Sequence, residues 1–260
     1  MKYRYGLQLY SVRKDLEKDL QGTLSKVKEM GYEAVEFFGE FKYPAQEVKQ
    51  VLDNIGLKIC GWHTPWHYLQ GDQLNETIAY FKDLGNKYVI IPGLPHNLTY
   101  SKEAWLSAAE EFNGLSEKLQ KHGMKIGYHN HFAELYDMDG EKPFHMFFSN
   151  TDSSVIMQVD IGHVLCGGAD LMDTIADYAG RAVSVHLKPY KKGCENPHEG
   201  YDTMIGDDDI PWAEFMSWCK EHGNTEWYIV EYESEALYAP LEGVQKCLEA
   251  LRKMENDSCF

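Results

Sequence analysis

The sequence lacks several features that mark common classes of protein. Its six cysteines are scattered, with no C-x-x-C pair and no short spacing, which excludes a zinc-ribbon signature and argues against a disulfide framework. Residues 1–11 lack the apolar core of a signal peptide, and no apolar run approaches the length of a membrane span. We therefore expect a cytoplasmic protein that does not bind membranes.

Basic side chains are also scarce. Lys and Arg number 25 against 41 Asp and Glu, which gives a formal net charge of −16 at pH 7. Such a surface repels phosphate backbones and anionic lipid headgroups, so we expect no nucleic-acid partner. Acidic side chains attract divalent cations, although most of them serve only to keep a surface soluble.

A glycine-rich phosphate-binding turn is missing after the first expected strand, which argues against an open doubly wound sheet. Short apolar runs recur along the chain, each followed by a helical pattern, as in βα units. The expected strands are residues 5–9, 34–38, 57–62, 88–91, 125–129, 155–159, 182–187 and 227–230. The expected helices are residues 16–30, 44–55, 74–84, 103–122, 143–148, 171–178, 211–222 and 241–254. This alternation predicts an α/β fold, a (β/α)8 TIM barrel formed by residues 1–260 as a single domain.

Polar side chains follow most of these strands at the point where each one ends. In a TIM barrel the active site is built from the carboxyl ends of the strands, so these side chains should meet at one mouth. Groups that can bind a metal or move a proton at these ends are His63, His129, His131, Glu134, Asp160, His163, His186, Lys188 and Glu231.

Three consecutive strands end in a candidate metal ligand, namely Asp160, His186 and Glu231. A single residue of this kind at a strand end is commonly a helix cap or a hydrogen-bonded rim residue. The coincidence over adjacent strands, together with a group from residues 129–134, favours a site with nitrogen and oxygen ligands. Such a set suits Mn²⁺, Zn²⁺, Fe²⁺, Co²⁺ or, less well, Mg²⁺.

Several segments also resemble a known family, the sugar phosphate isomerase/epimerase superfamily with the xylose isomerase-like TIM barrel. The resemblance extends over nearly the whole chain, and residues 129–131 match a subgroup with a His-Asn-His motif at strand five. The segments that carry it are residues 6–13, 28–36, 127–131, 158–163, 185–188 and 229–232.

The resemblance implies one divalent metal ion, Mn²⁺ or Zn²⁺ before Co²⁺, Fe²⁺ or Mg²⁺. The implied ligands are Glu134, Asp160, His186 and Glu231, with His129 as the substitute for Glu134. The metal would polarise a carbonyl and stabilise an enediolate after a base removes the neighbouring proton. Candidate acid/base groups are Glu231, His131 and His129, and Lys188 could neutralise the enediolate. His163 is expected to bind the substrate or orient Asp160, and a wall for the sugar is expected from Tyr10, Trp62, His63 and Trp66.

These inferences predict an isomerase or epimerase of a small sugar or sugar derivative, free or oxidised rather than phosphorylated. The main alternative is a lyase or dehydratase on the same site, of the inosose dehydratase or 3-keto-glycoside lyase type. An AP-endonuclease-like metal hydrolase requires a basic phosphate-binding face, which the net charge of −16 disfavours. A sugar-binding barrel without catalysis is a further alternative. Members of the superfamily often form dimers or tetramers, so the protein is a candidate homo-oligomer.

Overall fold

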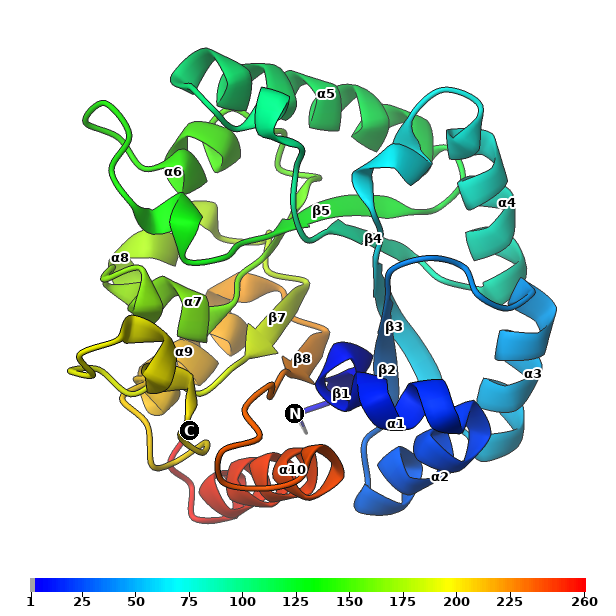
Figure 1. Cartoon of the computed structure of the whole chain (residues 1–260). Helices are drawn as coiled ribbons and strands as arrows, with labels where there is room; N and C mark the ends of the chain where they lie inside the picture. The colour runs from blue at the N-terminus through cyan, green and yellow to red at the C-terminus, as the bar shows by residue number, and fades with distance from the viewer. Residues whose placement is uncertain (1–2) are drawn as a thin grey trace.

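Eight parallel strands form one sheet in the computed structural model, which describes residues 3–260 (Figure 1). The sheet order is β6-β5-β4-β3-β2-β1-β8-β7. The ring is completed between β6 and β7 by an isolated parallel bridge from Asp160 to His186 and by a hydrogen bond from His186 N to Val159 O (2.9 Å). The strands are β1 (Tyr5–Gln8), β2 (Ala34–Phe38), β3 (Lys58–His63), β4 (Tyr88–Ile91), β5 (Lys125–His129), β6 (Ile156–Gln158), β7 (Ser184–Leu187) and β8 (Trp227–Val230).

Helices surround the strands on the outside, which confirms the predicted TIM-barrel fold class (Figure 1). Within residues 3–260, none of them is long and apolar enough to span a membrane. The α-helices are α1 (Arg13–Lys18), α2 (Leu20–Met30), α3 (Ala45–Ile55), α4 (Gln73–Leu84), α5 (Lys102–Gln120), α6 (Pro143–Phe148), α7 (Ile161–Cys166), α8 (Leu171–Ile175), α9 (Trp212–Trp218) and α10 (Pro240–Asn256).

The predicted boundaries differ from the structure at two functionally relevant places. The expected helix 16–30 is divided into α1 and α2 at Asp19, whose side chain accepts a hydrogen bond from Gly22 N (2.9 Å) and so begins a new helix. The short helix α7 was not expected. It begins directly after Asp160, which caps it, so a candidate metal ligand also starts a helix.

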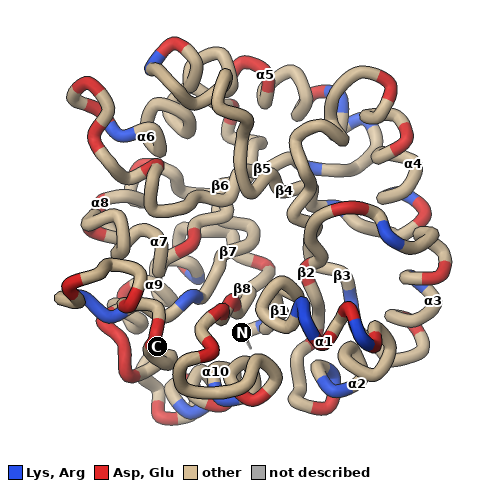
Figure 2. Tube along the Cα trace, viewed as in Figure 1, with Lys and Arg blue, Asp and Glu red and all other residues tan. Residues whose placement is uncertain are grey.

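Charged residues are concentrated on the helices and loops around the barrel. Figure 2 shows acidic positions spread over these outer segments with Lys and Arg positions interspersed among them. The exceptions are charged side chains buried inside the barrel, among them Glu36, Asp160, Lys188 and Glu231. Because burying a charge is costly unless it is compensated, these positions require a specific explanation.

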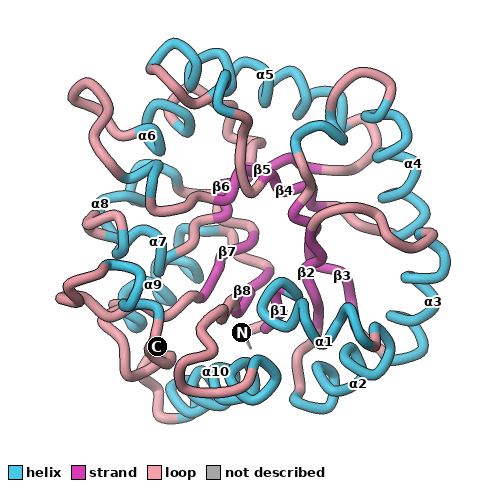
Figure 3. The backbone as a smooth tube through the Cα atoms, in the orientation of Figure 1, coloured by secondary structure: helices cyan, strands magenta, loops and turns pink. Residues whose placement is uncertain are grey.

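The interior of the barrel changes character along the strands, which form the central ring in Figure 3. Towards the amino ends, small apolar clusters include Ala34 with Ile229, and Ile156 with Ile90. Alternation along a strand directs residues two apart to the same face. The residues two positions after Ala34, Ile156 and Ile229 therefore also face inward. They are the polar residues Glu36, Gln158 and Glu231. The polar end of the interior is the carboxyl end, where a TIM barrel has its active site.

Candidate metal centre

Four buried side chains meet at the carboxyl ends of β5 to β8. They are His129, Asp160, His186 and Glu231, and the potential ligand atoms lie within 4.8 Å of one another. Two imidazoles and two carboxylates form the nitrogen and oxygen set that Zn²⁺ and Mn²⁺ accept. The sequence-predicted residues Asp160, His186 and Glu231 are thus brought together, and His129 completes the group.

Asp160 is held in place by its neighbours on both sides. Its Oδ1 accepts a hydrogen bond from His163 N (2.8 Å) at the start of α7, and its own main-chain N–H donates to Asn130 Oδ1 (2.9 Å). Its Oδ2 is buried and has no hydrogen-bond partner within residues 3–260. Burial raises the pKa of Asp160 to about 7, although the charge of Lys188 acts in the opposite direction.

His186 lies between carboxylates on both edges of its ring. Nδ1 is 2.5 Å from Glu231 Oε2 and 4.0 Å from Asp160 Oδ2, while Nε2 is 2.6 Å from Glu36 Oε2. Burial lowers the pKa of His186, but Glu36 and Glu231 outweigh it and raise the value to about 10. Burial likewise opposes ionisation of Glu231, but Lys188 and His186 hold its pKa well below the usual range.

His129 supplies the second orphaned atom of the group. Its Nδ1 is buried without a hydrogen-bond partner among the described residues. Burial and the nearby His186 and His63 keep the pKa of His129 well below its ordinary value, so the ring is neutral and has a lone pair available. Unpartnered buried polar atoms are rare in proteins. Two of them on members of one cluster of ligand-type side chains fit a divalent metal ion.

Glu134, the preferred fourth ligand in the sequence analysis, lies outside this group. Its Oε1 accepts a hydrogen bond from Tyr128 Oη (2.6 Å) and its Oε2 from His131 N (2.9 Å). Tyr128 precedes the inward-facing His129, so strand alternation directs its ring outward, where it packs against Phe112 of α5. Glu134 therefore braces the turn after β5, and His129, the alternative to it in the sequence analysis, is the side chain that lies with Asp160, His186 and Glu231.

A cavity of about 520 Å³ opens above the candidate metal group. Of the expected substrate-binding residues, Tyr10, His63 and His163 line it, and so does His131. Lys188 is buried beside it, with Nζ 3.3 Å from Glu231 Oε1 and 3.4 Å from His163 Nε2, and it also pairs with Glu233. The complete lining is Tyr10, Phe38, Gly39, His63, Pro65, Pro92, Gly93, His129, His131, His163, Glu231 and Glu233.

The two tryptophans expected in the wall are placed elsewhere. Trp62 stacks on Phe37 (ring centroids 4.9 Å apart), donates its indole N–H to Gly39 O (2.8 Å) and lines a separate pocket. Trp66 stacks on Phe112 (5.4 Å). Because successive residues of a strand point to opposite faces, only one of Trp62 and His63 can face the barrel interior, and it is His63.

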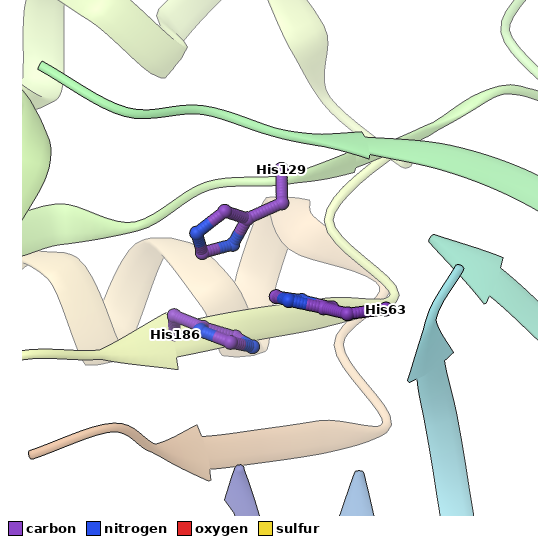
Figure 4. Close-up of side chains that lie close together, drawn as sticks. All are labelled: His63, His129 and His186. Atoms are coloured by element: carbon purple, nitrogen blue, oxygen red, sulfur yellow. The ribbon is translucent and has the colours of Figure 1, made fainter. Parts of the chain in front are cut away.

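Three imidazoles from β3, β5 and β7 lie close together, as Figure 4 shows. The His63 and His186 rings are nearly parallel, with centroids 5.1 Å apart, and His129 lies 4.6 Å from the first and 4.5 Å from the second. His131 stands further out, 5.2 Å from the ring of His129. Neither ring nitrogen of His131 has a hydrogen-bond partner within residues 3–260.

Glu36 is a buried functional candidate that sequence reasoning did not select. It lies on β2 and accepts hydrogen bonds from side chains of other strands, including His186. Burial raises the pKa of this carboxyl, but His63 and His186 outweigh burial and lower the value to about 2. The available signal was a single acidic residue inside the otherwise apolar run 34–38.

Comparison with known proteins gives a family match over most of the chain. The model of the xylose isomerase-like TIM barrel family matches residues 24–254. An inosose dehydratase of Clostridium perfringens is 24% identical over 224 residues, which are 81% of this chain and 69% of that protein.

Solved structures share the fold. A sugar phosphate isomerase/epimerase from Parabacteroides distasonis superposes with a TM-score of 0.80 at 22% identity, covering 97% of this chain and 98% of the other. The IolI protein with a bound zinc atom superposes with a TM-score of 0.70 at 14% identity, covering 98% of each chain.

Proposed function

Because the chain belongs to the xylose isomerase-like TIM barrel family, we propose that it is a divalent-metal-dependent lyase that removes water from a keto-polyol. An inosose or a 3-keto sugar derivative is the substrate class. The observation that carries this proposal is the buried group of two histidines and two carboxylates with two unpartnered atoms, placed under a histidine-lined cavity. The similarity to inosose dehydratases supports the lyase over the isomerase that the sequence favoured.

The metal ion would be held by His129, Asp160, His186 and Glu231. Zn²⁺ and Mn²⁺ fit this ligand set, and the IolI protein, which shares the fold, binds a zinc atom, which supports a divalent ion here. When bound, it supplies a Lewis acid that polarises the substrate carbonyl and makes the neighbouring C–H more acidic. The remaining chemistry depends on the side chains around the cavity.

Elimination of water requires a base and an acid on the substrate. The base takes the proton from the carbon next to the carbonyl, and the acid gives a proton to the hydroxyl on the following carbon, which leaves as water. His131 and His63 both line the cavity and lie outside the proposed ligand set. Burial lowers the pKa of His131, so its ring is neutral at pH 7 and can accept the proton from carbon. The imidazolium that forms can then give this proton to the leaving hydroxyl, so His131 acts first as the base and then as the acid.

Lys188 contributes a fixed positive charge next to this cavity. Burial lowers the pKa of its ammonium group, but Glu231, Asp160 and Glu233 outweigh burial and raise it, so Lys188 stays protonated. A protonated ammonium close to the reacting carbons stabilises negative charge that develops after proton removal. Its contact with His163 Nε2 (3.4 Å) links it to the cavity wall.

The charge of the cavity supports an uncharged substrate. Its lining contains Glu231 and Glu233 but no Lys or Arg among residues 3–260, and Lys188 is already paired with both glutamates. Among residues 3–260 the cavity wall thus offers no unpaired side-chain cation to hold a phosphate or carboxylate group. The net charge of −16 argues against nucleic acid as a substrate in the same way.

An isomerase or epimerase is the second candidate. It shares the first proton abstraction and then returns the proton to a carbon instead of expelling water. His131 and His63, which lie outside the ligand group, can act on two faces of a substrate. The likeness to a sugar phosphate isomerase/epimerase supports this alternative at the level of the fold.

Proton NMR in D2O with the metal-loaded protein tests the proposal. The panel contains inososes, 3-keto glycosides and ketoses, each with and without Mn²⁺ or Zn²⁺. A new alkene or enone signal with loss of water or an aglycone is expected. Deuterium next to the carbonyl with an interconverted product would select the isomerase instead, and no turnover despite bound metal would contradict both.

A further inference from the structure

Glu36 lies at the centre of a hydrogen-bond network just below the candidate metal group. The side chain is fully buried on β2. Its carboxylate faces four nitrogen atoms from four other strands: Gln8 Nε2 (2.8 Å), Gln158 Nε2 (2.8 Å), His186 Nε2 (2.6 Å) and His63 Nε2 (3.2 Å). A buried carboxylate with this many donors fixes the orientation of each of them.

The neighbouring strand makes room for this carboxylate. Gly61 of β3 pairs with Glu36 in the sheet, and a Cβ at Gly61 would lie 2.5 Å from Glu36 Oε1. A side chain at position 61 would therefore displace the acid from the barrel centre. The absence of a side chain there indicates that the local packing accommodates a carboxylate at this point.

The contact with Glu36 determines which nitrogen of His186 keeps its proton when a metal ion is bound. A carboxylate only accepts hydrogen bonds, so the nitrogen 2.6 Å from Glu36, Nε2, must be the N–H. The other ring nitrogen, Nδ1, faces Glu231 Oε2 at 2.5 Å and Asp160 Oδ2 at 4.0 Å, so without a metal ion it carries a proton as well, and this is the proton that a metal ion would displace. Nδ1 is therefore the nitrogen that is directed towards the other candidate ligands.

Gln158 extends the same constraint to His63. Its amide N–H groups donate to Glu36 Oε1 (2.8 Å) and to Ser184 Oγ (3.0 Å), which turns its Oε1 towards His63. His63 Nε2 lies 2.7 Å from that oxygen and 3.2 Å from Glu36 Oε2, so it faces two acceptors and must carry the proton. Nδ1 of His63 has no partner among the described residues, and His63 lines the cavity.

We propose that Glu36 is a positioning residue that fixes the tautomers of two histidines at once. It keeps the proton of His186 on Nε2, which leaves Nδ1 for the metal ion, and through Gln158 it keeps the proton of His63 on Nε2, which leaves Nδ1 as an acceptor towards the substrate. This inference rests on the metal site of the proposed function. Outer carboxylates that orient a histidine ligand in this way contribute to metal affinity without touching the ion.

The first test is the side-chain ¹H–¹⁵N spectrum of the zinc-loaded wild-type protein, which distinguishes protonated, unprotonated and metal-bound ring nitrogens. His63→Gln and His186→Gln variants assign the signals. The expected spectrum has zinc on Nδ1 of His186, and Nε2–H on both His186 and His63. Zinc on Nε2 of His186, or a proton on Nδ1 of His63, would overturn the proposal.

Two variants and one control separate positioning from a merely structural role. Glu36→Gln should lower zinc affinity roughly 10- to 100-fold, the usual effect of losing an outer partner of a ligand. Gln158→Met keeps the contact between Glu36 and His186, so zinc affinity should remain while His63 becomes a mixture of tautomers. Glu33→Gln, just before the same strand and with a half-buried side chain, should change neither. Zinc affinity is measured by competition with a chromophoric chelator.

The outcomes are distinguishable. If wild-type protein binds neither zinc nor manganese, the proposed function fails. If wild-type protein binds zinc and Glu36→Gln binds it equally well, only the positioning role fails. If Glu36→Gln does not fold, the wild-type spectrum and Gln158→Met still decide, because both retain the buried carboxylate.

Discussion

The two halves of the barrel contribute differently to the site. Strands β5 to β8 end in His129, Asp160, His186 and Glu231, whose ligand atoms converge directly. In the other half, β1, β2 and β3 contribute Gln8, Glu36 and His63, which are joined to the first half by hydrogen bonds. One half supplies candidate metal ligands, and the other orients them.

This difference appears in the position of each side chain along its strand. Glu231 directly follows the last residue of β8, and Asp160 comes two residues after the last residue of β6, whereas Glu36 is the third residue of β2 and lies deeper in the barrel. Residues at the mouth can reach both a metal ion and a substrate. Residues one layer deeper reach only other side chains. Substitutions there should therefore alter the metal affinity and the histidine tautomers more than the rate of turnover.

The largest effect is expected from removing a candidate ligand without disturbing its helix. Asp160→Asn retains an oxygen that can cap α7, because Asn caps helices about as well as Asp. Metal affinity should fall roughly 100-fold or more, at least the effect of losing an outer partner. Asp170→Asn is the matched control, since Asp170 caps α8 in the same way at an exposed position. Equal metal affinity in both variants would remove Asp160 from the ligand set.

The next largest effect separates catalysis from metal binding. His131→Asn should lower turnover by about 10²- to 10⁴-fold, the range for a lost acid or base, while metal content stays at the wild-type level. His122→Asn, in the exposed turn after α5, serves as the control for the loss of one imidazole. Loss of metal from His131→Asn would show that His131 is a ligand rather than an acid/base group.

The candidate ligands predict a pH dependence of metal affinity. In the metal-free protein the pKa of His186 is raised to about 10 and that of Asp160 to about 7. Protons occupy these groups below those values, so the metal must displace one proton between pH 7 and 9 and two below pH 7. Affinity should therefore rise by about tenfold per pH unit above pH 7 and more steeply below it.

Competition titrations at pH 6, 7, 8 and 9, corrected for protonation of the chelator, measure this slope. Calorimetric titration with the metal in buffers of different ionisation enthalpy gives an independent count of the protons released on binding. An affinity that does not change with pH would contradict ligation by these two groups.

The smallest effect on activity is expected outside the cavity. Trp62→Phe removes an indole N–H that donates to Gly39 O and leaves space in the aromatic cluster, which should cost about 1 to 3 kcal/mol of stability. Turnover should be retained. Tyr10→Leu, on the cavity wall and 38% exposed, should give the reverse result, with weaker substrate binding and unchanged stability. Thermal unfolding and steady-state kinetics of both variants make the comparison.

The sequence predicted the barrel because each strand is a short apolar run between polar segments. It also identified Asp160, His186 and Glu231 as a group, because a polar residue at the end of a buried run signals a strand end facing the mouth. These features are local in the sequence. Strand alternation, applied strictly, would also have separated His63 from Trp62.

Other features depend on tertiary contacts that no local pattern encodes. The turn after β5 folds Glu134 back onto Tyr128, so its distance along the chain from His129 does not indicate where its carboxylate lies. Glu36 is a single acid in an apolar run, and its role depends on side chains from β1, β3, β6 and β7. Only the closed barrel brings these groups together.

The most direct test of the account is the anomalous diffraction signal at the zinc edge from crystals of the zinc-loaded protein. The expected map has one strong peak bounded by His129, Asp160, His186 and Glu231, with Glu134 still bonded to Tyr128. A peak coordinated by Glu134 in place of His129, or a fully loaded protein with no peak inside this group, would contradict it.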